Sequence, residues 1–125
     1  MIYGEDVLAS LPNLRVVKGD IRDQVLLRQL IPGHDAVIHL ACISNDPGVE
    51  LYPELGKSIN LNAFSPLVEI SRNAGVKRFI YSASSSCYGI PDTTPTPETA
   101  PIRAMYPYAL TKYLGEQYVL HWNNV

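Results

Sequence analysis

The chain has 125 residues and a formal net charge of −2, so it carries no basic field that would suit nucleic acid or an acidic membrane surface. Hydrophobic residues make up 46% of it, which is enough to build the packed core of one domain. No apolar run approaches the roughly 20 residues that cross a bilayer, so we expect no membrane and no nucleic-acid partner.

The first expected elements are a strand and a helix. Residues 14–18 form a short β-branched run that ends at Gly19, which is typical of a strand. Residues 21–31 then place apolar side chains at helical spacing, and a Pro-Gly pair ends them. Because Asp20 directly precedes this predicted helix, it is also a candidate N-cap.

A second strand and a long helix are expected in the middle of the chain. Residues 36–40 are an almost unbroken apolar run, as expected for a strand buried on both faces of a parallel sheet. Residues 45–48, Asn-Asp-Pro-Gly, predict a turn. A helix is expected over residues 53–73, and Pro66 should kink it, because proline lacks an N–H and crowds the carbonyl of Asn62.

The last third predicts a strand, a long loop and a helix. Residues 77–82 are expected to form the third strand. Repeated prolines exclude regular helix or central strand between residues 88 and 106, and loops of this length usually serve a site. Residues 107–121 predict a helix that starts at a proline. Strands that alternate with helices predict an α/β fold with three strands in a parallel sheet.

Tyr108 and Lys112 are candidates for acid–base chemistry. Side chains four residues apart on a helix share one face, so the two groups should be neighbours. A phenol ordinarily releases its proton near pH ~10, and an adjacent cation favours the phenolate form. Because so short a spacing also arises by chance, the surrounding sequence has to support the assignment.

Six stretches supply that support. They are Gly19 to Asp23, Ala36 to Ala41, Asn60, Gly75 to Tyr81, the serine run Ser82 to Ser86, and the pair Tyr108 and Lys112. In this order they resemble the extended short-chain dehydrogenase/reductases, the NAD(P)-dependent sugar-nucleotide epimerase/dehydratase family. The resemblance covers nearly the whole chain and implies a partial Rossmann-like, doubly wound parallel sheet.

The glycine-rich turn that opens a dinucleotide-binding fold is not among these stretches. The chain has eight glycines, and they nowhere form a cluster that could cradle a phosphate. We therefore expect residues 1–125 to be the central part of an NAD(P)-binding Rossmann domain. The glycine loop is then expected before Met1 and the substrate lobe after Val125, and the fragment alone is expected to be inactive.

The resemblance also implies where a cofactor binds. The residues matching Asp20 and Ile21 hold its adenine end, and those matching Leu40 and Ala41 line it. The cofactor contacts implied in full are Asp20, Ile21, Leu40, Ala41, Asn60, Ser82, Tyr108 and Lys112. The cofactor is expected to be NAD or NADP, with NAD favoured.

The same resemblance assigns Tyr108, Lys112 and Ser84 to catalysis. Tyr108 takes a proton from a sugar hydroxyl, Lys112 favours the phenolate, and Ser84 orients the reacting oxygen. Ser84 and the two serines after it, Ser85 and Ser86, are expected to contact the substrate. Family 4,6-dehydratases place Asp-Glu at the positions of Ser85 and Ser86. The two serines therefore favour an epimerase, with a reductase as the near alternative.

A second class of function is a non-catalytic member of the fold, which binds a dinucleotide or serves as a scaffold. Loss of Tyr108 or Lys112 would indicate such a protein, and because both are present we expect the full-length parent to be an enzyme acting on a nucleotide sugar. Family members commonly dimerise through two helices. Since both are present here, a homodimer through residues 53–73 and 107–121 is expected.

The cysteines and His39 predict neither disulfides nor a metal. Cys42 and Cys87 cannot form a disulfide framework, so we expect a reduced, cytoplasmic protein. Cys87 is expected to be a small buried side chain rather than a catalytic acid. His39 and Cys42 have a spacing seen in metal sites, but no second pair of ligands exists. A structural role for His39 and no metal are therefore expected.

Overall fold

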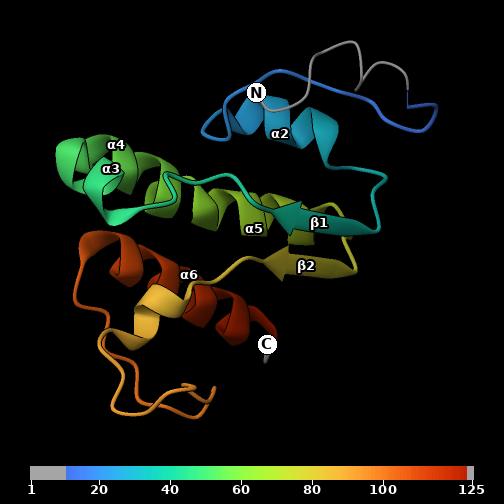
Figure 1. The fold of residues 1–125 in the computed structure, drawn as a ribbon. Coiled ribbons are helices and arrows are strands. Elements are labelled where there is room, and N and C mark those ends of the chain that lie inside the picture. The colour runs from blue at the N-terminus through green and yellow to red at the C-terminus, as the bar shows by residue number, and fades with distance from the viewer. Residues whose placement is uncertain (1–10, 124–125) are drawn as a thin grey trace.

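The computed structural model describes residues 11–123. Two parallel strands and a set of helices make up this range (Figure 1). In chain order the elements are α2 (Gln24–Leu30), β1 (Ala36–His39), α3 (Asp46–Leu51), α4 (Pro53–Lys57), the π-helical turn η1 (Ser58–Asn62), α5 (Phe64–Asn73), β2 (Arg78–Tyr81), the 3₁₀ turn η2 (Ser85–Tyr88) and α6 (Pro107–Asn123). None of the helices in residues 11–123 is long and apolar enough to cross a membrane.

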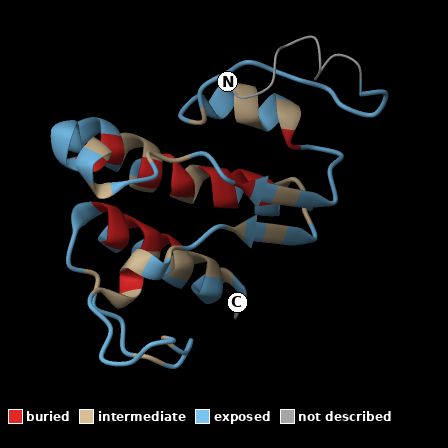
Figure 2. Cartoon of the chain, in the orientation of Figure 1, coloured by how far each residue is buried: buried red, intermediate tan, exposed pale blue. Residues whose placement is uncertain are grey.

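The two strands pair in parallel and present one face to the helices. Ala36 lies opposite Arg78 in the ladder, and His39 lies opposite Tyr81. Because successive side chains of a strand point to opposite faces, His39 and Tyr81 share one face. Both pack there against Phe64 of α5, which is only 2% exposed. Figure 2 shows the buried residues concentrated on α5 and α6, below and beside the strands.

The opposite face of the sheet is exposed. Ile38 and Ile80 on this face have 61% and 44% of their surface accessible. The prediction that residues 36–40 are buried on both faces is therefore wrong for the described chain. The physical reason is that the helices of residues 11–123 cover only one face of the sheet.

The first predicted strand is also absent from the described chain. Residues 14–18 have no regular structure, and Val16 and Val17 are 59% and 41% exposed. An extended segment becomes a strand only when a neighbour accepts and donates its backbone hydrogen bonds, and β1 and β2 pair only with each other. The described sheet therefore has two strands where the sequence predicted three, although the α/β class is confirmed.

Helix α2 begins later than the sequence suggested, at an aspartate other than Asp20. The Asp23 carboxylate accepts hydrogen bonds from the backbone N–H groups of Val25 and Leu26, each at 3.0 Å. It thereby satisfies two of the donors that the start of a helix leaves unpaired. Asp20 as the N-cap is wrong, because its carboxylate is paired instead with the guanidinium of Arg22.

This cap gives a stability prediction. Replacing Asp23 by Ala should lower the free energy of unfolding by about 1 kcal/mol, because both capping hydrogen bonds are lost. The matched control is Asp20→Ala, which removes an exposed carboxylate of the same segment without touching the cap. Urea unfolding followed by circular dichroism checks both. A larger loss for Asp20→Ala than for Asp23→Ala would contradict the assignment.

The predicted long helix of residues 53–73 is divided into three pieces. Its first piece, α4, passes into the π-helical turn η1, where the Ala63 N–H donates to the Ser58 carbonyl at 3.1 Å. Pro66 then sits in the first turn of α5, so the interruption falls close to the predicted kink. Helical structure also starts earlier than expected. Residues 45–48 open α3 rather than forming a simple turn, and the Asn45 side chain caps it.

The long connection before α6 is irregular, as predicted. No helix or strand occurs between Gly89 and Tyr106. Arg103 makes two of the contacts that hold this loop. The Arg103 N–H donates to the Cys87 carbonyl at 2.8 Å, and the Arg103 guanidinium pairs with Asp92 at 2.6 Å. Gly89 has a positive φ of 65°, and a Cβ there would lie 2.6 Å from the Arg103 carbonyl oxygen, so glycine is required.

Candidate active site

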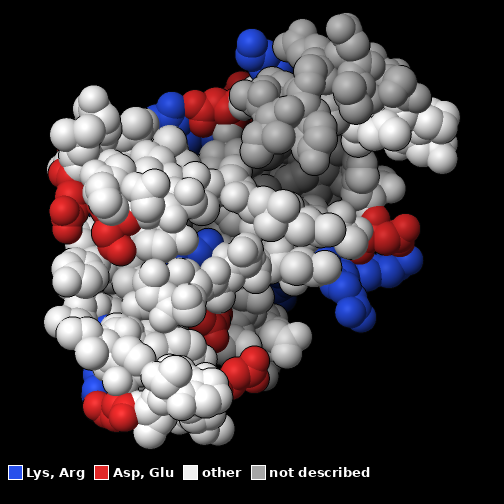
Figure 3. Space-filling model, viewed as in Figure 1, with Lys and Arg blue, Asp and Glu red and all other residues white. Residues whose placement is uncertain are grey.

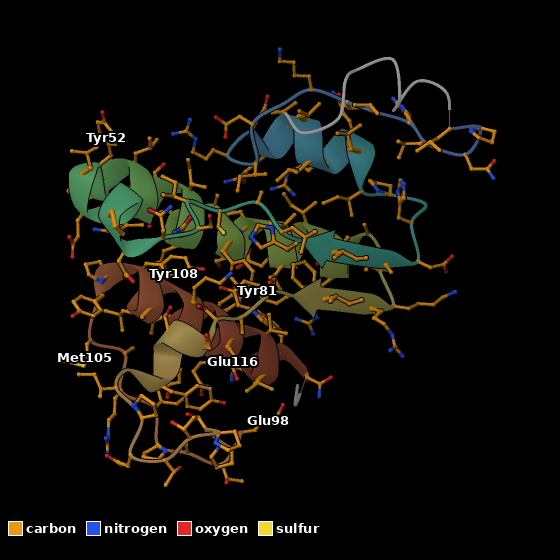
Figure 4. All side chains as sticks on the ribbon, in the orientation of Figure 1. Tyr52, Tyr81, Glu98, Met105, Tyr108 and Glu116 are labelled. Atoms are coloured by element: carbon orange, nitrogen blue, oxygen red, sulfur yellow. The ribbon has the colours of Figure 1, made fainter. Side chains whose placement is uncertain are left out.

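The Tyr–Lys pair lies in the first half of α6, on its buried side. Tyr108 is 8% exposed and Lys112 is 4% exposed. Pro107 starts the helix, and its fixed φ suits that position. Figure 4 shows Tyr108 near the start of α6, below the helices that precede α5. Within the same turn the Thr111 hydroxyl donates to the Tyr108 carbonyl at 2.7 Å. The two predicted catalytic side chains are thus held on one rigid element.

Lys112 is a buried cation without an anionic partner in the part of the chain that the structure describes. Its Nζ makes no hydrogen bond or ion pair with any of residues 11–123, and it lies 4.3 Å from the ring centroid of Tyr81. Burial lowers the pKa of Lys112, and the nearby thiols of Cys42 and Cys87 oppose that effect. A desolvated ammonium group is costly unless other groups stabilise it. The side chain is therefore suited to receive hydroxyl or other oxygen acceptors from a ligand.

The serine run forms a turn that packs against α6. Ser84 is the N-cap of η2, and its hydroxyl oxygen accepts the Ser86 N–H at 3.2 Å. The thiol of Cys87 lies 3.5 Å from the Ala109 carbonyl oxygen of α6. Cys87 is 2% exposed, and burial raises its pKa, so the expectation of a small buried side chain is confirmed. Ser82 and Ser85 are exposed on either side of the cap.

A cavity of about 500 Å³ lies beside this turn. Ser84 and Ser85 line it together with Glu98 of the long loop and Glu116 of α6. Figure 4 places both glutamates on the side of α6 where η2 packs. Carboxylates accept hydrogen bonds, so this cavity is suited to hydroxyl groups rather than phosphates. Tyr108 and Lys112 are not among the residues lining it.

Asn60 holds the loop that follows β1. Its amide oxygen accepts the Ile43 N–H at 2.8 Å, and its amide nitrogen donates to the Ile43 carbonyl at 3.0 Å. The side chain is 4% exposed, so both bonds are protected from water. Leu40 and Ala41, which precede this clamp, are exposed. Asn60 therefore positions the segment in which a cofactor contact was expected.

Asp20 forms a hydrogen-bonded ion pair with Arg22. The Arg22 Nε donates to both carboxylate oxygens of Asp20, at 2.9 and 3.0 Å. These hydrogen bonds lower the pKa of Asp20 to about 2. Arg22 also donates to the Ser58 hydroxyl at 3.4 Å, which links the Asp20 segment to η1. Ile21 follows Asp20 and is partly buried.

The π-helical turn η1 is a junction that the sequence did not predict. It carries Asn60, receives the hydrogen bond from Arg22, and packs against α6. Isolated π turns in helices are frequent at functional sites, because the extra residue redirects side chains. Pro66, which deprives the Asn62 carbonyl of a helical donor, is the one signal in the sequence that could have indicated this irregularity.

An aromatic group beneath Lys112 was also missed by sequence reasoning. Tyr81 stacks on His39 with ring centroids 6.0 Å apart and an interplanar angle of 10°, and Phe64 lies 4.7 Å from Tyr81. His39 is 6% exposed in this group, as expected for a structural residue. Within residues 11–123 no three His, Cys, Asp or Glu side chains are grouped as metal ligands. Alternation along β1 and β2 is the signal that could have found the group.

His39 makes stability dependent on pH. Burial, and then the charge of Lys112, lower the pKa of His39 below its ordinary value of 6.5. The unfolded chain therefore binds a proton at a higher pH than the folded chain does. The contribution of His39 to stability is complete above about pH 6.5 and should fall as the pH drops below that value.

The measurement is the free energy of unfolding in urea at pH 7.5 and pH 5.5. His39→Phe keeps a ring in the aromatic group and should flatten the difference. The control His121→Asn changes an exposed histidine near the end of α6 and should leave the difference as it is in the wild type. If His39→Phe retains the full pH dependence, another group is responsible.

The surface around these elements carries both signs of charge. Figure 3 shows acidic and basic side chains interspersed around the visible face, with mostly uncharged surface between them. The exposed pairs Asp20 with Arg22 and Asp35 with Lys77 are examples. Such exposed pairs contribute little to stability, so we expect packing around α5 and α6 to be the main source of stability.

The fold and the Tyr–Lys pair together define a class of protein. Parallel strands joined by a helical crossover, with a serine-rich turn after the second strand, form a Rossmann-type nucleotide-binding unit. The model of the NAD dependent epimerase/dehydratase family matches residues 4–124. The chain belongs to this family, and the resemblance noted in its sequence is confirmed.

Individual relatives carry related activities. A UDP-glucose 4-epimerase of Streptomyces lividans is 36% identical over 98 residues, which cover 76% of this chain and 30% of that protein. The crystal structure of a UDP-glucose-4-epimerase from Stenotrophomonas maltophila, with bound NAD and formylated UDP-arabinopyranose, has a TM-score of 0.79 at 32% identity and covers 85% of this chain and 32% of its own. DesIV, a dTDP-glucose 4,6-dehydratase from Streptomyces venezuelae crystallised with NAD and TYD, has a TM-score of 0.88 at 27% identity, covering 96% and 37%. The chain thus spans about a third of the length of these relatives.

Proposed function

We propose that this chain is part of an NAD-dependent epimerase that acts on a nucleotide sugar by transient oxidation to a keto sugar. The observation that carries the proposal is the buried Lys112, one helical turn from Tyr108 and without an anionic partner among the described residues. The named relatives support the same reaction class, because UDP-glucose 4-epimerases recur among them. The serines at positions 85 and 86 favour epimerisation over dehydration.

The residues present fit a bound dinucleotide. The Lys112 side chain is buried and its Nζ has no hydrogen-bond partner within residues 11–123, which suits the hydroxyls of a ribose. By resemblance to the family, the proposed cofactor contacts are Asp20, Ile21, Leu40, Ala41, Asn60, Ser82, Tyr108 and Lys112. Bound NAD would supply the hydride acceptor for the oxidation and the hydride for return to the opposite face, which inverts the carbon.

The chain's own residues move the proton. The phenolate of Tyr108 accepts the proton of the sugar hydroxyl, and the charge of Lys112 favours that phenolate. Ser84 accepts the Ser86 N–H, so its own hydroxyl proton is left to donate to the reacting oxygen of the sugar. Tyr108 then returns the proton when the keto group is reduced again. Ser85 and Ser86 are proposed to contact the sugar.

The test is product analysis with UDP-, GDP-, CDP- and dTDP-sugars, using the protein expressed from its complete reading frame. Inversion of one sugar carbon without net change in cofactor supports the epimerase. Net reduction or oxidation of the cofactor would make the protein a reductase instead. Tight dinucleotide binding without turnover of any sugar would leave the non-catalytic binding protein or scaffold as the explanation.

We also propose a homodimer through the helices of residues 53–73 and 107–121. Leu55 of α4 and Leu110 and Leu114 of α6 are 41%, 47% and 41% exposed, which provides apolar surface on both helices. Light scattering should give twice the mass of one chain for the wild type and the mass of one chain for Leu110→Asp. A monomeric wild type would contradict the proposal.

A further inference from the structure

Tyr81 occupies the space between the end of β2 and the middle of α6 (Figure 4). Its ring lies 4.3 Å from the Lys112 Nζ, and its hydroxyl donates to the Lys112 carbonyl at 3.4 Å. A Cβ on Gly115 would lie 2.5 Å from the Tyr81 hydroxyl oxygen and 2.8 Å from Cζ. The tyrosine therefore lies directly on the helix backbone, at the one position where a glycine leaves room for it.

The ring meets an electrostatic need of the lysine. Lys112 is 4% exposed and has no anionic or hydrogen-bonding partner within residues 11–123. The face of an aromatic ring attracts a cation, most strongly where water is excluded. Tyr81 is itself held from behind, because it stacks on His39 and contacts Phe64. These contacts fix the position of the Tyr81 ring, and the ring in turn fixes the position of the Lys112 ammonium group.

We infer that Tyr81 is a positioning residue, which holds the Lys112 ammonium over its ring and so presents it to the ligand of the active site. Gly115 is also required for this arrangement, because only a residue without Cβ lets the Tyr81 ring approach α6 so closely. The inference rests on the proposed role of Lys112 in the reaction. Tyr81 is not among the residues proposed to contact the substrate or the cofactor.

The first test measures Lys112 directly. The pKa of its side chain is followed by NMR in the protein expressed from its complete reading frame, for the wild type, Tyr81→Phe and Tyr81→Leu. The ring favours the charged form, so Tyr81→Leu should lower the pKa of Lys112 by about one pH unit. Tyr81→Phe keeps the ring and should restore the wild-type value. An unchanged or raised pKa in Tyr81→Leu would overturn the inference.

The other ionisable groups around Lys112 are the same in Tyr81→Leu and in Tyr81→Phe. They come from β1 and the residues after it, from η2 and from α6 itself: His39, Cys42, Cys87, Tyr108 and Glu116. Because all of them remain in both variants, the difference between Tyr81→Leu and Tyr81→Phe reports on the ring alone.

A second variant covers the case in which Tyr81→Leu does not fold. Gly115→Ala improves the helix propensity of α6 but places a methyl group against Tyr81. It should move the ring away from Lys112 and lower the pKa of Lys112, as Tyr81→Leu is expected to do. A folded Gly115→Ala chain with a wild-type Lys112 pKa would equally overturn the inference.

Turnover by the protein from its complete reading frame separates this inference from the proposed function. Tyr81→Leu should lower kcat about tenfold with KM for the sugar little changed, and Tyr81→Phe should retain wild-type kcat. If no sugar is turned over but the pKa of Lys112 still depends on Tyr81, only the proposed function fails. If turnover depends on Lys112 but neither its pKa nor kcat responds to Tyr81, only the positioning role fails.

Discussion

Replacing Tyr108 by Phe should abolish most of the sugar turnover, with kcat falling by about 10²–10⁴-fold. The substitution removes one hydroxyl group and leaves the ring that is buried at the start of α6. Without that hydroxyl no group of α6 takes the proton from the sugar, whereas the contacts that bind the substrate remain. The measurement is steady-state turnover of whichever nucleotide sugar the wild-type protein converts.

The matched control for this variant is Tyr106→Phe. Tyr106 is 53% exposed and lies two residues before Tyr108, so its replacement should leave kcat unchanged. Thermal unfolding and dinucleotide binding should be the same for both variants, which separates loss of chemistry from loss of fold. Wild-type kcat in Tyr108→Phe would exclude this phenol as the acid–base group.

Lys112→Met should have two opposite effects, a loss of turnover and a gain in stability. Methionine fills a similar volume without a charge, so the cost of burying an unpaired ammonium group disappears. We expect the free energy of unfolding to rise by about 1 kcal/mol at neutral pH. Turnover should fall by at least about 10²-fold, because in the proposed mechanism the charge of Lys112 supports the proton transfer to Tyr108. A residue kept at the expense of stability is expected where function requires it.

The lowered pKa of Lys112 also predicts how the free energy of unfolding changes with pH. Burial lowers the pKa of Lys112 in the folded chain below its ordinary value of 10.5. Between these two values the unfolded form of Lys112 holds more protons, so the contribution of Lys112 to stability should rise as the pH increases toward 10.5. Lys112→Met should lack this rise, and the control Lys57→Met, at an exposed lysine, should keep it. Urea unfolding at pH 7, 8.5 and 9.5 is the measurement, and equal slopes in all three proteins would refute the assignment.

Helices were predictable from the sequence where the signal is local. The spacing of apolar side chains and a proline at the start predicted residues 107–121, and α6 runs from Pro107 to Asn123. Pro66 likewise indicated where the long central helix would be interrupted. The π geometry of that interruption was not predictable, because it depends on hydrogen bonds between residues 58–63 and on packing against α6.

Strands were less predictable, because pairing is not a local property. Residues 36–40 and 77–82 contain β1 and β2, which pair with each other in parallel. Residues 14–18 have an equally suitable composition but no partner in the described chain, so they remain irregular. Composition indicates that a segment can be a strand, and only a neighbouring strand makes it one.

The sequence by itself determined the family and the residues that carry it, because the Tyr108 and Lys112 spacing and the serine run are local patterns. The assignment of Tyr108, Lys112 and Ser84 to catalysis stays a prediction. The tertiary structure alone decided that Lys112 is buried above Tyr81, a residue 31 positions earlier in the chain, with no anionic partner among residues 11–123. The physical reason is that helical periodicity fixes which side chains share a face, whereas desolvation depends on which distant residues pack against that face.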